Sequence, residues 1–143
     1  MKYYKSETNQ VFAYESDGSQ DAHIKPGLRP MTTGEVQKHI KPPESAAQMQ
    51  QRLTAALNDH LNQVAGQRSY DDRFTCSLRA GYPGPFQAEG QTFAAWMDDC
   101  NMVAYQILAE VKQGLRPIPT EAELIAALPV IEWPPSPVPE GAA

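Results

Sequence analysis

The feature that most constrains this chain is a long amphipathic pattern over residues 91–114. Its apolar side chains recur at spacings of three and four, which places them on one face of an α-helix. Gly114 can adopt the left-handed conformation that ends many helices, and Pro117 follows soon after it. The expected apolar face consists of Phe93, Trp96, Met97, Cys100, Ala104, Ile107, Leu108 and Val111. We therefore expect one long helix that packs on a core through this face.

A second stretch of similar length and amphipathicity covers residues 44–67. Because the two patterns match in length, the two helices are expected to pair. The apolar stripe of the second helix consists of Ala46, Met49, Leu53, Ala56, Leu57, Leu61, Val64 and Ala65. A third, short helix is expected over residues 70–80, with one face made of Tyr70, Phe74, Ser77 and Leu78.

Two further short helices are indicated by their starting residues. Thr32 with Glu35, and Thr120 with Glu123, have the spacing of a capping box, in which two side chains satisfy exposed backbone N–H groups at a helix start. The first helix is expected over residues 32–40 and the second is expected to stop at Pro129. The apolar stretch 130–133 then predicts a short strand-like end.

Residues 2–16 predict a β-hairpin. Two segments rich in aromatic and β-branched residues flank a turn-like stretch at 6–10. A lone two-stranded hairpin is only marginally stable, so its large aromatic side chains need a surface to pack on. The helical part of this chain and a different chain are both possible surfaces.

The expected fold class is therefore α+β, mainly α: an N-terminal β-hairpin followed by a small antiparallel helical bundle. In a chain of 143 residues with 13 prolines, part of the length must be extended connector. The expected organisation is a hairpin and irregular segment over 1–31, a helical domain over 32–133, and a Pro-rich disordered tail over 134–143.

Composition argues against several classes of partner. The net charge is −5 and the pI is about 5.1, and no basic stripe is present, so we expect no nucleic-acid binding. No apolar run is long enough to cross a membrane, and the N-terminus lacks the apolar core of a signal peptide, so a cytoplasmic protein is expected. Cys76 and Cys100 are expected to be buried thiols, and two cysteines alone cannot form a tetrahedral zinc site.

No pattern typical of catalysis is present. His23, His39 and His60 share no metal-ligand spacing, and His60 is expected at the boundary of an apolar stripe. The acidic pairs at 71–72 and 98–99 are sequence neighbours, which diverge on a helix and form no dyad by themselves. No nucleophile motif or phosphate-binding glycine loop is present. We expect a non-enzymatic protein without cofactor or metal.

Exposed aromatic residues are instead the candidates for binding another protein, since large aromatics dominate interface energetics. The candidate partner-binding residues are Tyr4, Phe12, Tyr14, Tyr82 and Phe86. The alternative is that such residues close a small core from outside. This alternative is favoured for Phe86 and Trp133, and both interpretations stay open for the hairpin.

Two long segments resemble one family of viral proteins. They read MKYYKSETNQVFAYESDGSQDAHIKPGLRPMT and YDDRFTCSLRAGYPGPFQAEGQTFAAWMDDCNMVAYQILAEVKQGLRPIPTEAELIAALPVIEWP. Both are similar to the tail-fibre assembly proteins of tailed bacteriophages and prophages. Phe86 to Glu89 and Trp96 match the most recognisable positions of that family, and we expect them to determine the fold. Phe86 would anchor a loop, and Glu89 would lie near the start of the long helix.

The resemblance implies a chaperone that helps fibre chains to trimerise, or a cap that stays on the fibre. The implied partner is the phage tail-fibre protein or another tail component. The implied location is the host bacterial cytoplasm during assembly, or the virion tail. The alternative is a permanent structural component of the tail, baseplate or fibre. A third hypothesis, an enzyme acting on surface glycans, would need two carboxylates about 5–9.5 Å apart in a cleft. The sequence leaves the oligomeric state open.

Overall fold

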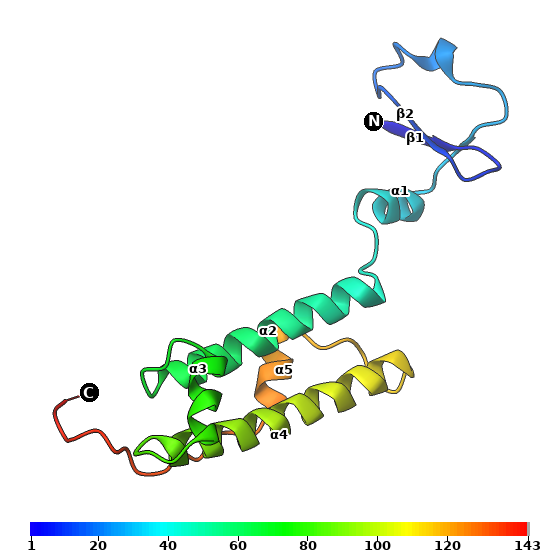
Figure 1. The fold of residues 1–143 in the computed structure, drawn as a ribbon. Coiled ribbons are helices and arrows are strands. Elements are labelled where there is room, and N and C mark those ends of the chain that lie inside the picture. Colours follow the sequence, from blue (N-terminus) through cyan, green and yellow to red (C-terminus); the bar gives the residue numbers. More distant parts are fainter. Residues whose placement is uncertain (143) are drawn as a thin grey trace. The chain divides into compact units, whose positions relative to one another are not determined.

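The computed structural model describes residues 1–142 and confirms an α+β fold that is mainly α (Figure 1). Its internal contacts divide the chain into two compact units, Met1–Glu44 and Ser45–Ala143. The first unit holds three short strands and helix α1, and the second holds helices α2 to α5. The division falls after helix α1, whereas the sequence pattern placed this helix with the helical domain.

The N-terminal unit is built on a three-stranded antiparallel sheet in the order β2-β1-β3. Strands β1 (Lys2–Lys5) and β2 (Val11–Tyr14) form the predicted hairpin. Its turn closes through hydrogen bonds between Ser6 and both Asn9 and Gln10. Strand β3 (Arg29–Pro30) was not predicted, because two residues are too few to show an alternating pattern.

Each face of this sheet packs on a segment of the same unit. The register pairs Tyr4 with Phe12, so Tyr4, Phe12 and Tyr14 lie on one face, where Tyr4 and Tyr14 make a T-shaped contact at 5.7 Å. The segment between β2 and β3, which includes the 3₁₀-helix η1 (Asp21–His23), reaches this face. Lys25 places its Nζ 5.3 Å from the Phe12 ring centroid.

Helix α1 (Thr33–Ile40) contacts the other face of the sheet. The ring of Tyr3 lies 5.9 Å from the ring of His39, and Lys5 forms an ion pair with Glu35. The hairpin therefore packs within its own unit, on two segments that follow it in the chain.

Both predicted capping boxes are present, at Thr32 before α1 and at Thr120 before α5 (Glu121–Ala127). Two more begin α2 (Ala46–Gly66) and α3 (Arg73–Leu78), at Ser45 and Asp72. In each case the cap side chain accepts from the N3 backbone N–H, and the N3 side chain accepts from the cap N–H.

The core of the helical unit lies between α2, α4 (Gln87–Lys112) and the shorter helices. The predicted apolar faces of both long helices are confirmed except at Ala46, which is exposed at the start of α2. Met49, Leu53, Leu57 and Leu61 of α2 are buried, as are Phe93, Trp96, Cys100 and Ile107 of α4. Both cysteines are buried and unbonded to one another, as expected. The Trp96 Nε1 donates to the Pro129 carbonyl at 2.7 Å, which satisfies the indole inside the core.

Helix α4 begins at Gln87, earlier than the expected residue 91, and Gly90 explains the difference. A glycine inside a helix lowers helix propensity, so the pattern appeared to start after it. In the structure a Cβ at Gly90 would lie 2.4 Å from the Ala80 backbone nitrogen. Gly90 therefore permits the 3₁₀-helix η2 (Arg79–Gly81) to pack directly on the first turn of α4.

The predicted apolar face of the third helix was wrong. Helix α3 is shorter than expected and buries Cys76, whereas Phe74 and Leu78 are 65% and 67% exposed. The guanidinium of Arg73 lies 4.3 Å from the Phe74 ring centroid and covers part of that ring. In so short a helix the packing against α2 and α4, not the apolar count, decides which side is buried.

No strand forms at residues 130–133. This segment is extended, and the ring of Trp133 stacks on Phe93 with centroids 6.0 Å apart. Its Nε1 donates to Gln67 at 3.0 Å. Trp133 thus covers one end of the core, and residues 134–142 continue without helix or strand.

Candidate interaction surfaces

The five aromatic residues selected from the sequence lie in two separate places. Tyr4, Phe12 and Tyr14 meet on one face of the N-terminal sheet, where Tyr14 is buried and the other two are half-buried. Tyr82 and Phe86 line a small hollow of about 70 Å³ beside the start of α4. Phe86 is half-buried, and Tyr82, which is 45% exposed, is the more accessible of the two.

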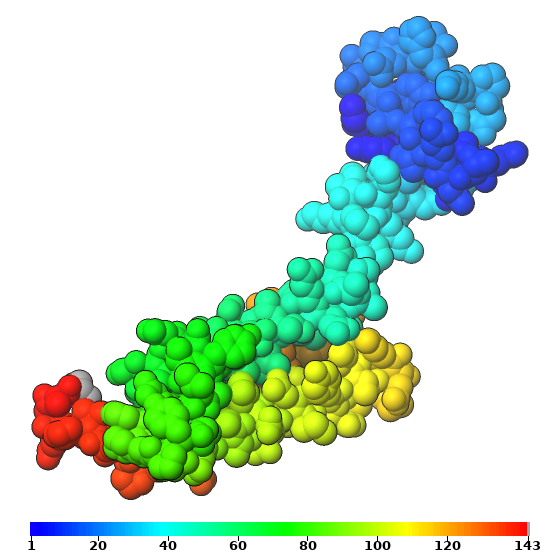
Figure 2. Space-filling model, viewed as in Figure 1, coloured from blue at the N-terminus to red at the C-terminus, as the bar shows by residue number. Residues whose placement is uncertain are grey.

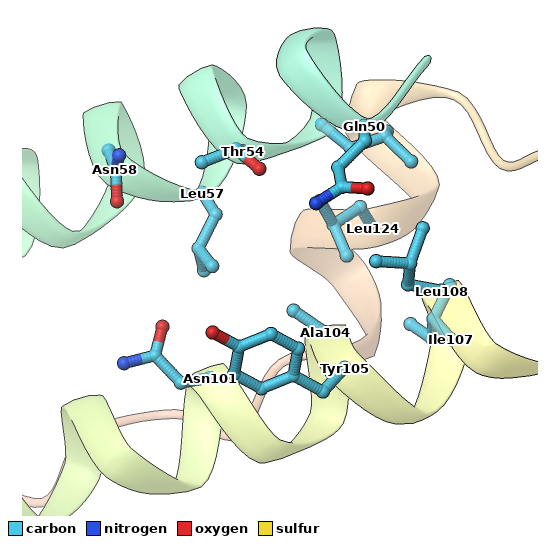
Figure 3. Close-up of a pocket in the computed structure, with 11 residues that line it drawn as sticks. Gln50, Thr54, Leu57, Asn58, Asn101, Ala104, Tyr105, Ile107, Leu108 and Leu124 are labelled. Atoms are coloured by element: carbon cyan, nitrogen blue, oxygen red, sulfur yellow. The ribbon is translucent and has the colours of Figure 1, made fainter. Parts of the chain in front are cut away.

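A groove that the sequence pattern did not single out lies between α2 and α4, with α5 behind it (Figures 2 and 3). Its volume is about 310 Å³. The floor is apolar and the rim is polar. The floor consists of Leu53, Leu57, Ala104, Ile107, Leu108 and Leu124, and the rim of Gln50, Thr54, Asn58, Asn101 and Tyr105.

The α2 side of this groove is uncharged. A shallower hollow continues over the outer surface of α2, and every residue that lines it is alanine, glutamine, threonine or asparagine. The charged Arg52 points to the other side of α2, where it lies 4.0 Å from Glu121 of α5. Lys112 marks one end of the groove, since its Nζ donates to the Gln50 Oε1 at 3.3 Å. Such a surface suits a neutral, amphipathic protein segment.

The only buried carboxylate in residues 1–142 belongs to Glu89, in the first turn of α4. Arg68 donates to its Oε1 and the Tyr70 hydroxyl donates to its Oε2, both at 2.8 Å. Burial, and the hydrogen bond to Glu89, raise the pKa of Tyr70 well above its usual range. Arg68 also donates to the Pro134 carbonyl at 2.7 Å and lies 5.2 Å from the Trp133 ring centroid.

The cluster of Glu89, Arg68 and Tyr70 has a structural role. Both oxygens of Glu89 already accept hydrogen bonds, so the carboxylate is oriented and charge-balanced within the protein. Sequence analysis placed Glu89 near a helix start but did not identify its partners. Arg68 and Tyr70 lie on the connection between α2 and α3, and no periodic pattern links them to α4.

Burial shifts the pKa values of Cys76, Cys100 and His60 in the direction that favours their neutral forms. Burial raises the pKa of Cys76 to about 12 and that of Cys100 to about 11, so both thiols stay protonated at neutral pH. Burial lowers the pKa of His60, whose ring lies 5.9 Å from that of Trp96. Each shift has the direction expected where an apolar environment penalises the charged form.

In residues 1–142, no three or more His, Cys, Asp or Glu side chains are grouped so as to hold a metal ion. None of the helices in this part of the chain has both the length and the apolar character needed to cross a membrane. Searches of family models, curated proteins and solved structures found no match for this chain.

Proposed function

We propose that this chain is a non-enzymatic assembly protein of a bacteriophage tail fibre, acting as a chaperone or as a cap bound to the fibre. The proposal begins from the resemblance of the two long segments quoted above to that family. It is supported by surfaces that suit protein binding, while Glu89, Cys76 and Cys100 are occupied or neutral inside the core.

The observation that carries the proposal is the open outer edge of strand β2. Met31 donates its backbone N–H to the Tyr3 carbonyl, so the backbone groups of Tyr3 face β3. Those of Lys2 and Tyr4 consequently face β2. The backbone groups of Val11 and Ala13 are left pointing outward, and Ala13 is exposed.

The opposite edge of the sheet is protected. Strand β3 is two residues long and contains Pro30, which has no backbone N–H to donate. Unpaired edges are the places where a protein adds a strand from a partner. The β2 edge is therefore the surface on which an extended segment of the fibre would dock.

Co-expression with a tail-fibre protein from the same phage or prophage tests the function. The expected result is soluble fibre trimers only when this chain is present. Soluble trimers formed equally well without it would contradict the chaperone proposal.

A proline variant tests the edge. Ala13→Pro removes the outward N–H of β2 and is expected to weaken fibre binding by about tenfold or more, since proline cannot donate to an added strand. Glu7→Pro is the matched control, because Glu7 follows Ser6 in the turn, where proline is well tolerated. If both variants bind the fibre equally well, the β2 edge is not the fibre-binding surface.

The second candidate function is a permanent component of the tail, baseplate or fibre. The same edge favours it, since strand addition forms long-lived contacts as readily as transient ones. Mass spectrometry of purified particles separates the two candidates. A chaperone that leaves is absent from particles, and a cap or structural subunit is present.

A further inference from the structure

The exposed side of helix α4 carries a regular stripe of residues. Asp98, Tyr105 and Lys112 recur every seven residues, which is close to two turns, so they lie along one side of the helix. All three are exposed, and Tyr105 is 66% exposed. Met102, which is 67% exposed, lies one turn before Tyr105. Two large apolar side chains thus stand in solvent between an acidic and a basic residue.

The two charges are placed symmetrically about Tyr105. Asp98 precedes it by seven residues and Lys112 follows it by seven. If a second copy of α4 is laid antiparallel on the first with a two-fold axis at Tyr105, Asp98 of each copy faces Lys112 of the other. In a parallel arrangement each charge would face its own kind. The stripe is therefore complementary to itself in one orientation, which is the requirement of an isologous contact.

The surface beside the stripe also suits a second copy. The chain carries a net charge of −5, so two copies repel unless they meet where acidic residues are few. The neighbouring wall of α2 supplies such a place, because Gln50, Thr54 and Asn58 on the rim are neutral. The groove of about 310 Å³ between α2 and α4 is larger than one aromatic side chain. Tyr105, on the groove rim in Figure 3, can enter the groove of the other copy.

We propose that this face binds a second copy of the chain, with the two α4 helices antiparallel about Tyr105. Tyr105, Met102 and the groove floor supply the buried area, and the Asp98–Lys112 pairs select the orientation. This contact lies on the helical unit and does not depend on the fibre-binding edge of β2.

Charge reversal in the full-length chain tests the orientation by sedimentation across a range of concentrations. Asp98→Lys or Lys112→Asp alone turns two attractive pairs into repulsive ones and is expected to weaken the dimer about tenfold or more. The double variant Asp98→Lys with Lys112→Asp restores opposite charges and is expected to recover the dimer. Asp99→Lys is the matched control, since it makes the same change on a different side of α4.

Cross-linking tests the position of the axis. Tyr105→Cys places two thiols near the two-fold axis, and mild oxidation is expected to give a disulfide-linked dimer. The native Cys76 and Cys100 are fully buried and do not compete. Phe74→Cys is the control, because Phe74 is an aromatic residue of the same unit and is 65% exposed, close to the 66% of Tyr105.

A chain that stays monomeric at high concentration overturns the proposal. A dimer that cross-links more readily through Phe74→Cys than through Tyr105→Cys also overturns it. A dimer whose dissociation constant is unchanged by both single charge reversals overturns the antiparallel orientation. Loss of fibre binding in Ala13→Pro with an intact dimer would separate this contact from the proposed function.

Discussion

The two units of this protein are stabilised by different interactions. In the N-terminal unit Tyr14 is the only buried residue, and the ion pairs Lys2–Asp21, Lys5–Glu35 and Arg29–Glu35 connect its segments. The helical unit instead has one continuous buried cluster from α2 through α5. Exposed ion pairs contribute little each, whereas apolar burial contributes about 25 cal/mol per Å². We expect the helical unit to be the more stable of the two, and the N-terminal unit to respond more to salt and acid.

The largest effect is expected from Trp96→Ala. Trp96 is 6% exposed and lies beside Phe93 and His60, so its removal leaves a large cavity. The free energy of unfolding of the helical unit should fall by about 3–5 kcal/mol. Denaturant titration followed by circular dichroism measures it. Phe74→Ala, at an exposed position, should change the value by less than about 0.5 kcal/mol. A loss below about 1 kcal/mol for Trp96→Ala would mean that this face is not core.

The next effect tests the close packing of η2 on α4. A Cβ at position 90 would lie 2.4 Å from the Ala80 nitrogen, so Gly90→Ala should cost about 1–3 kcal/mol in the helical unit. Gly66→Ala in α2 is the control within the same unit, because no atom lies within 4 Å of its added Cβ. This control should be neutral or stabilising by up to about 1 kcal/mol, as alanine favours helix. Similar losses of unfolding free energy in both variants would show that the close contact between Gly90 and η2 does not determine the effect.

A smaller effect is expected on the stability of the N-terminal unit at acidic pH. Arg29, Lys5 and the Thr32 backbone hold the pKa of Glu35 at about 2, below its usual 4.5. Since the folded-state pKa is depressed, the stability it confers is present above pH 4.5 and is lost as the pH falls towards 2. The contacts that Glu35 makes with Arg29, Lys5 and the Thr32 backbone should therefore loosen in this range.

Both tryptophans, Trp96 and Trp133, lie in the helical unit, so their fluorescence follows that unit alone. Amide signals of β1 in NMR spectra follow the other unit. Glu35→Gln should remove most of the acid sensitivity of β1, and Glu7→Gln, in the exposed turn, should leave it unchanged. An acid response of β1 that is unchanged in Glu35→Gln would contradict the assignment of this pH dependence to Glu35.

The smallest expected effect concerns the reactivity of the two thiols. Because burial raises the pKa values of Cys76 and Cys100 to about 12 and 11, a thiol reagent should react with neither in the native protein at pH 8. Both should react in denaturant. The labelling rate therefore reports opening of the helical core, and rapid labelling in native buffer would show that this core is loose.

Much of the fold was predictable from local patterns. The stripes of α2 and α4, the capping boxes at Thr32 and Thr120, the hairpin and the buried cysteines each follow from periodicity or from side-chain chemistry within a few residues. The burial of the candidate partner-binding residues was not evident from the sequence. Tyr14 is buried in its own unit, Tyr4, Phe12 and Phe86 are half-buried, and Tyr82 is 45% exposed.

The remaining features depend on residues that are far apart in the sequence. The hydrogen-bond partners of Glu89 are Arg68 and Tyr70, which lie on the connection between α2 and α3. The groove forms only because α5 lies behind α2 and α4. A single sequence shows which face of a helix is apolar, because that follows from its 3.6-residue period. Which neighbour covers that face, and which polar groups meet there, was decided only when the helices packed.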